Sequence, residues 1–174
     1  MYEDQVTTPD GSPGRYVTVT MKPGVAVLPI DADGQVHLTR QFRYAIGRES
    51  VEVASGAIEN GEDAEQAAKR ELREELGIIA DRWTDLGMFD MDTSIVRCPV
   101  RMFSATGLRP TTAERNATDA NGRFTTPFDS AVEMVMNGDI THAPSCVLLL
   151  KALQAGAHFA EQDVQGAQHG SSET

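Results

Sequence analysis

The chain has 174 residues and a formal net charge of −11 at pH 7, with 40% hydrophobic and 24% charged residues. This length and composition fit one globular domain with short appendages, which can bury a core without disulfides or a structural metal. The acidic balance disfavours nonspecific binding to nucleic acid or to an anionic membrane, and the longest apolar stretches are too short to span a bilayer.

The N-terminal third of the chain is expected to be mainly strands. Residues 1–15 are polar and rich in proline and glycine, so a loose N-terminal arm is expected there. A strand is expected at Tyr16–Thr20, followed by two more at Gly24–Ile30 and Gln35–Arg40. Between these two lies Asp31-Ala32-Asp33-Gly34, which favours a β-hairpin because glycine adopts a positive φ without strain.

The clearest helix is predicted over Asp63–Leu76, after a short strand at Ser50–Ala54. Alanine and leucine recur in it at steps of three and four residues, which gives one apolar stripe. Asp63 is expected to cap its N-terminus and Gly77 its C-terminus.

The remaining segments complete a mixed α/β pattern. We expect strands near Asp85–Asp90, Pro99–Ala105 and Phe124–Thr126, a loop over Thr111–Gly122, and helices over Asp129–Met136 and Ser145–Ala155. Residues 159–174 are rich in Gln, Gly and Ser and are expected to be disordered. Strands interrupted by helices predict the α/β fold class.

The cysteines and histidines show no metal-binding pattern. Cys98 and Cys146 stand far apart and match no spacing such as CxxC, so we expect two reduced thiols. The chain begins with acidic residues and has no apolar run behind them, so we expect no secretory signal and a cytoplasmic location. The four histidines, among them His37 and His142, are scattered, and structural or solvent-facing roles are expected for them.

Three glutamates on the predicted helix suggest a function. Glu71, Glu74 and Glu75 are spaced i, i+3 and i+4, so their carboxylates project from one face. Like charges at this spacing repel, and a hard cation such as Mg²⁺ or Mn²⁺ relieves the repulsion. Arg70 could hold the glutamates in place, and Glu62 reaches the same cluster if its loop folds back. Taken alone, this charge pattern is usually a solvated helix face.

The full pattern over Gly56–Ile78 decides between these two interpretations. It reads Gly, five residues, Glu, seven residues, then Arg-Glu-apolar-x-Glu-Glu-x-Gly-apolar, and every specified position matches. A chance match anywhere in the chain has a probability of about one in ten million. This segment resembles the Nudix box, the signature of the Nudix hydrolase superfamily.

The resemblance implies a fold, a cofactor and residue roles. It implies an α/β/α sandwich around a mixed sheet over residues 16–158, with the box forming a loop–helix–loop. Glu71 and Glu75 are implied as ligands of Mg²⁺ or Mn²⁺, together with the backbone carbonyl of Ser55. Glu74 is implied as a third ligand or as the base, and Arg70 orients the glutamates. The implied chemistry is metal-assisted attack of water on phosphorus.

Two segments upstream of the box indicate the substrate. Arg40–Tyr44 and Glu52–Gly56 resemble the RQ-aromatic-R and ELPAG segments of ADP-ribose and nucleotide-sugar pyrophosphatases. By this resemblance Arg43 contacts the substrate and Glu52 lines the site. The alternatives are an ordinary surface cation for Arg43 and a salt-bridge partner for Glu52.

The chain also departs from this subgroup. Ala54 replaces the usual proline, Thr93-Ser94 stands where a Ser-Pro-Gly turn is frequent, and Cys98 falls near the place of a frequent acidic residue. Many members take a catalytic base from a loop after the sheet, which here is Thr111–Gly122. Glu114 is its only glutamate and is the candidate base, and an incidental surface glutamate is the alternative.

The leading hypothesis is hydrolysis of ADP-ribose or a nucleotide sugar to a nucleoside monophosphate and a sugar phosphate. Subgroup relatives are usually dimers that exchange N-terminal strands, which implies a homodimer involving residues 1–22. One alternative is a Nudix hydrolase of nucleoside triphosphates or dinucleoside polyphosphates. Another is a Nudix-fold nucleotide-binding module without turnover, which the complete set of box glutamates disfavours.

Overall fold

The computed structural model describes residues 1–111 and 122–166, with side chains to residue 156 in the last helix. The elements are β1 (Tyr2–Thr7), β2 (Pro13–Thr20), β3 (Gly24–Pro29), β4 (Gln35–Arg43), the 3₁₀ turn η1 (Tyr44–Ile46), β5 (Arg48–Glu52), β6 (Ala54–Ala57), α1 (Ala64–Leu76), β7 (Ile78–Asp90), β8 (Val96–Arg97), β9 (Pro99–Pro110), β10 (Arg123–Pro127), α2 (Phe128–Met136) and α3 (Ala143–Gly166). The candidate base Glu114 and residues 167–174 of the expected tail lie outside the described residues, whereas residues 159–166 of that tail belong to α3.

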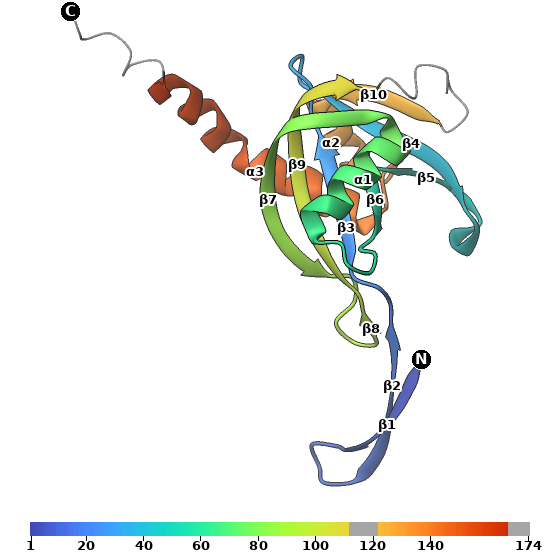
Figure 1. Cartoon of the computed structure of the whole chain (residues 1–174). Helices are drawn as coiled ribbons and strands as arrows, with labels where there is room; N and C mark the ends of the chain where they lie inside the picture. Colours follow the sequence, from blue (N-terminus) through green and yellow to red (C-terminus); the bar gives the residue numbers. More distant parts are fainter. Residues whose placement is uncertain (112–121, 167–174) are drawn as a thin grey trace, which may run out of the picture.

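A four-stranded mixed sheet with the order β6-β3-β9-β7 forms the centre of the molecule (Figure 1). β3 pairs parallel with β9 and antiparallel with β6, and β7 pairs antiparallel with β9. Successive side chains of β3 point to opposite faces: Val25 and Val27 belong to one core cluster, and Ala26 and Leu28 belong to the other. Because both faces are apolar, both must be covered.

Helices cover the two faces of this sheet. Ala67, Ala68 and Leu72 of α1 pack on the face that carries Val25 and Val27. On the opposite face, α2 and α3 complete the other core cluster, for example with Leu148 and Leu149. The expected α/β/α sandwich with a mixed sheet is therefore confirmed. No described helix is long and apolar enough to cross a membrane.

The prediction that β3 and β4 pair as a hairpin is wrong, although the turn between them forms. The turn forms, with Gly34 at φ 71° and the Asp31 N–H donating to the Gln35 carbonyl at 3.0 Å. After a single bridge between Ile30 and Val36 the two strands separate, and β4 joins a second sheet with the order β10-β4-β5. The physical reason is that both edges of β3 are already occupied by β6 and β9.

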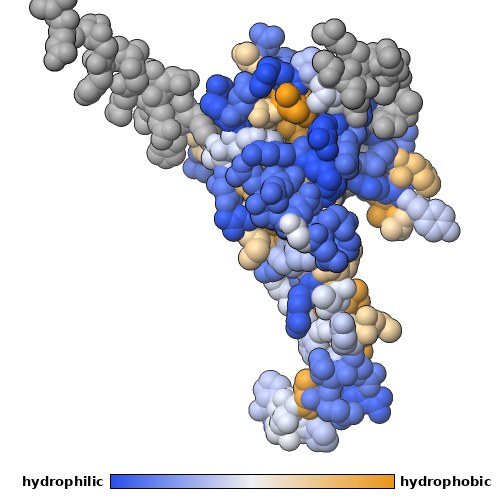
Figure 2. Space-filling model, in the orientation of Figure 1, coloured by the Kyte–Doolittle hydropathy of each residue, from blue (hydrophilic) through white to orange (hydrophobic). Residues whose placement is uncertain are grey.

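The N-terminal arm is an ordered hairpin rather than the expected loose segment. β1 and β2 pair antiparallel from Tyr2–Thr18 to Thr7–Pro13, and the end of β2 pairs with β8. The hairpin extends away from the body of the molecule in Figure 1. Its exposed apolar side chains include Tyr2, Tyr16 and Val17, and Figure 2 shows apolar residues along this arm. Two strands alone are marginally stable in water, so the arm is a natural place for further contacts.

Candidate active site

The predicted catalytic helix has both of its expected caps. The Asp63 carboxylate accepts from the Gln66 N–H at 2.8 Å, and the Gln66 side chain accepts from the Asp63 N–H at 3.0 Å. This capping box satisfies donors that the first helical turn leaves open. At the other end, Gly77 takes a left-handed conformation with φ 68° and ends the helix. The local sequence thus fixes the length of α1 and the faces on which its glutamates lie.

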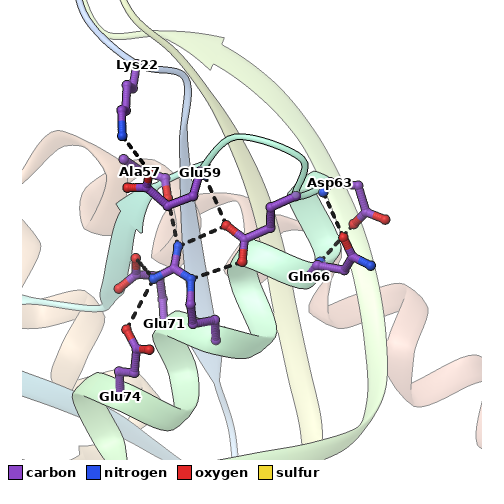
Figure 3. Close-up of polar contacts among 9 residues, drawn as sticks. Lys22, Ala57, Glu59, Asp63, Gln66, Glu71 and Glu74 are labelled. Carbon is purple, nitrogen blue, oxygen red and sulfur yellow. Dashed lines mark hydrogen bonds and ion pairs between the residues drawn. The ribbon is translucent and has the colours of Figure 1, made fainter.

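Arg70 is the centre of the polar cluster on α1. Figure 3 shows Glu71, Glu74 and Ala57 of this cluster. The Nε and Nη2 of Arg70 donate to the two carboxylate oxygens of Glu62 at 3.0 and 3.1 Å, which confirms that the loop folds back. Nη1 donates to Glu71 at 2.6 Å and to Glu74 at 3.2 Å, and Nη2 also donates to the Ala57 carbonyl at 2.8 Å. One guanidinium therefore joins three carboxylates and the strand β6.

Gly56 makes room for the Glu71 carboxylate. A Cβ atom at position 56 would lie only 1.9 Å from Oε1 of Glu71 and 2.1 Å from its carboxylate carbon. Gly56 belongs to β6 and pairs with Val25 in the central sheet, so its backbone is held in place. The Glu71 side chain is 12% exposed, and burial raises its pKa although Arg70 lowers it. The buried carboxylate of Glu71 thus packs directly against the backbone of Gly56 in the central sheet.

Glu75 lies one turn further along the same face. Its Oε2 accepts from the backbone N–H of Ser55 at 2.9 Å, which places Ser55 next to the cluster. Burial, reinforced by the charge of Glu71, raises the pKa of Glu75 to about 7. Glu71 and Glu75 are therefore both hard to ionise in this environment. A cation bound beside them would stabilise their carboxylate forms.

The donor set fits a hard divalent cation in its chemistry. Glu71 and Glu75 are crowded carboxylates, Glu74 is half exposed, and all are oxygen donors of the kind that Mg²⁺ and Mn²⁺ prefer. Among the side chains of residues 1–111 and 122–156, however, no group of three acidic, histidine or cysteine side chains is arranged to hold a metal ion. The reason is visible in the contacts, because Glu71 and Glu74 are both turned toward Arg70.

Arg43 and Glu52 form a second polar unit near the helix. The Arg43 Nε donates to Oε1 of Glu52 at 2.8 Å, and its Nη2 donates to Oε2. The Glu52 side chain is only 2% exposed, and Arg43 is 41% exposed. Burial alone would raise the pKa of Glu52, but the hydrogen bonds from Arg43, with a further contribution from His142 when its ring is protonated, hold it below its usual value. Glu52 is thus a salt-bridge partner, and Arg43 is a partly exposed cation that a substrate can still reach. The two interpretations, a structural ion pair and a substrate contact, are compatible.

A cavity of about 510 Å³ opens beside Glu75. Its other lining residues come from β4, from β5 and from the position just before β10: Thr39, Arg40, Gln41, Phe42, Glu49 and Gly122. The cavity thus combines a cation, an exposed aromatic ring and a carboxylate of the α1 cluster. A ligand with a flat ring and negative groups fits this lining.

The structure brings together most of the residues that the sequence singled out. Glu71, Glu74 and Arg70 are in direct contact, and Glu75 and Ser55 are bonded to each other. Sequence reasoning missed His142, whose Nδ1 lies 3.7 Å from Oε2 of Glu52. No local signal could have found this contact, since the two residues are far apart in the chain and meet only through packing of α3.

Comparison with known proteins identifies the family of the chain. A family model described as the NUDIX domain matches residues 20–132. The chain belongs to the NUDIX family. An ADP-ribose pyrophosphatase of Mycobacterium tuberculosis is 31% identical over 160 residues, covering 88% of this chain and 76% of that protein. Another from Bacillus subtilis is 35% identical over 89 residues, covering 51% of this chain and 48% of that protein.

A solved structure supports the fold of this NUDIX domain. The crystal structure of an ADP compounds hydrolase has a TM-score of 0.74 at 21% identity and covers 88% of this chain and 91% of the other. The resemblance to Nudix pyrophosphohydrolases, and within them to ADP-ribose pyrophosphatases, is confirmed. Hydrolases of this family generally use divalent metals.

Proposed function

We propose that the chain hydrolyses the pyrophosphate bond of a nucleoside diphosphate linked to another group, with ADP-ribose or a nucleotide sugar as the leading substrates. The observation that carries this proposal is the cavity of about 510 Å³ lined by Glu75, Arg40 and Phe42. The cavity adjoins Glu75 of α1, and its size and lining support a ligand that carries a nucleoside. The names of the relatives point to the same substrate class.

In this proposal Arg43 binds the diphosphate and Glu52 holds Arg43. Arg43 uses Nε and Nη2 for Glu52, and Nη1 donates to no residue that the structure describes. A guanidinium held by one carboxylate and half open to solvent suits a phosphate oxygen. Arg43 does not itself line the cavity, but its positive charge partly offsets the rise that burial causes in the pKa of Glu75.

Divalent metal, Mg²⁺ or Mn²⁺, would be held by Glu71, Glu74 and Glu75 with the Ser55 carbonyl. When bound, such a metal lowers the pKa of water and neutralises charge that grows on the diphosphate. Glu62 keeps Nε and Nη2 of Arg70 occupied, so Arg70 stays in place if Glu71 and Glu74 turn away from Nη1. The function of Arg70 is thus to orient the carboxylates.

The base is Glu74 or Glu114 in this proposal. Glu74 is the most exposed member of the cluster, with 53% of its side chain accessible, so water can reach it. Glu114 lies outside the described residues and remains a candidate on its position in the sequence. Replacing each by glutamine separately and comparing turnover distinguishes the two.

We also propose a cytoplasmic homodimer that forms through the N-terminal hairpin. The exposed apolar side chains of β1 and β2 need a partner surface, and a second copy of the chain supplies one. The end of β4 and the turn η1 carry further exposed apolar residues, Phe42, Tyr44 and Ile46, and Tyr44 is 94% exposed.

A substrate screen tests the proposed function. Purified protein is incubated with ADP-ribose, nucleotide sugars, dinucleoside polyphosphates or nucleoside triphosphates, each with Mg²⁺, Mn²⁺ or EDTA, and products are separated by chromatography. We expect metal-dependent release of a nucleoside monophosphate and a sugar phosphate. Glu65→Gln is a matched control because Glu65 lies on another face of α1, where it pairs with Lys69. Preferred turnover of triphosphates, or turnover in EDTA, would contradict the proposal.

A further inference from the structure

A buried carboxylate at the end of β5 needs explanation. Glu52 is 2% exposed, and its pKa is held below the usual value, so it is ionised. Burying a charge is costly unless partners compensate for the lost water. Arg43 supplies two hydrogen bonds from β4. These bonds hold the Arg43 guanidinium in place only if the Glu52 carboxylate is also held in place.

The segment that leads into α3 supplies the second support. Nδ1 of His142 lies 3.7 Å from Oε2 of Glu52 and 2.8 Å from Oγ of Ser145. Ser145 is fully buried, and its Oγ accepts from the backbone N–H of Val53 at 3.0 Å. The start of α3 is thus bonded to the chain immediately after Glu52 and contacts the Glu52 side chain as well.

The two contacts of Ser145 are hydrogen bonds, whereas His142 approaches the Glu52 carboxylate at 3.7 Å without a hydrogen bond. The His142 side chain is 21% exposed, and its pKa is lowered, chiefly by burial, so the ring is neutral at pH 7. A neutral ring that Ser145 holds 3.7 Å from the Glu52 carboxylate restricts the space open to the carboxylate without cancelling its charge. Glu52 therefore stays ionised and binds Nε and Nη2 of Arg43. Nη1 of Arg43 is left to donate to a ligand.

We propose that His142, supported by Ser145, is a positioning residue that orients Arg43 through Glu52. This rests on the proposed function, in which Arg43 binds the diphosphate. The chain of contacts runs from Ser145 of α3 to His142, then to Glu52 and to Arg43. His142 does not touch the substrate in this scheme, and it acts on binding rather than on the chemical step.

A double-mutant cycle tests the proposal with the best substrate of the screen. His142→Ala is expected to raise KM about tenfold and to change kcat by less than about threefold, because it disturbs ground-state binding. In an Arg43→Ala background, the same replacement is expected to have almost no further effect on KM. His142→Asn retains a polar side chain and should recover part of the loss. Additive effects in the cycle, or a fall in kcat with unchanged KM, would overturn the proposal.

His37→Ala is the matched control. His37 also contacts a carboxylate, with Nε2 at 3.1 Å from Oδ2 of Asp31, and its side chain is 23% exposed. It belongs to β4 but lies toward the turn after β3, away from the cavity. Its replacement should leave both KM and kcat unchanged. A KM increase equal to that of His142→Ala would mean that loss of any histidine–carboxylate pair produces the effect.

A second measurement separates this proposal from the proposed function. The Nε–H of Arg43 gives an NMR signal, assigned by its loss in Arg43→Lys, whose exchange with water is slowed by the bond to Glu52. His142→Ala is expected to speed this exchange at least about threefold, whereas His37→Ala should not. If no diphosphate is hydrolysed, the proposed function fails while this result still supports the positioning role. Unchanged exchange in His142→Ala would overturn the positioning role even in an active enzyme.

Discussion

Replacing Gly56 by alanine is the most direct test of the catalytic cluster. The new Cβ would lie 1.9 Å from Oε1 of Glu71, whereas ordinary contact begins at 3.4 Å. The Glu71 carboxylate must therefore move by roughly 1.5 Å, because strand β6 is held by its pairing with β3 and cannot easily move instead. That movement breaks the 2.6 Å bond between Glu71 and Nη1 of Arg70.

The expected result separates activity from stability. Misplacing a catalytic group by about 1 Å costs about a hundredfold in rate, so we expect a loss of at least about that size in kcat/KM. The atom that must yield is the end of a flexible side chain, so the free energy of unfolding should fall by only about 1–3 kcal/mol. Product formation from the best substrate and urea denaturation measure the two quantities on the same protein.

Gly156→Ala is the control for this experiment. Gly156 lies in α3, and a Cβ there would meet no atom within 4 Å. Its replacement should leave activity unchanged and stabilise the helix by up to about 1 kcal/mol. Activity of Gly56→Ala within about threefold of the unmodified protein would refute the reasoning, since the Glu71 position would then be unimportant. Global unfolding of Gly56→Ala would refute the predicted separation of the two effects.

Three further predictions follow from the same site and from the arm. Glu74→Gln and Glu75→Gln should each lower kcat by at least about a hundredfold while circular dichroism shows a retained fold, and activity in both variants would refute their roles. The raised pKa of Glu75, about 7, means that the folded state holds a proton which the unfolded chain releases above about 4.5. In EDTA, this contribution to the free energy of unfolding is lost as pH rises from about 4.5 to about 7. Glutamine does not titrate, so urea denaturation should show a smaller fall in stability over this pH range for Glu75→Gln than for the unmodified protein. Sedimentation at micromolar concentration should show a dimer that deletion of residues 1–20 converts to monomer, and a monomeric full chain would exclude the dimer.

The sequence determined the parts of this protein that depend on local chemistry. The period of alanine and leucine, the capping Asp63 and the terminating Gly77 specify α1 without reference to the rest of the chain. The i, i+3, i+4 spacing then places Glu71, Glu74 and Glu75 on one side of it. The residues of β3 are apolar on both faces, which likewise indicates a central strand that is covered on two sides.

Only the tertiary structure decided which partners meet across the chain. The separation of β3 from β4 depends on competition for the edges of β3, which no local pattern records. The contact between His142 and Glu52 exists because α3 packs back onto the sheet. The fit of Glu71 against Gly56 requires two elements to approach at a set distance. Local sequence fixes torsions and faces, whereas long-range contacts depend on packing of all elements at once, and packing decided these three features.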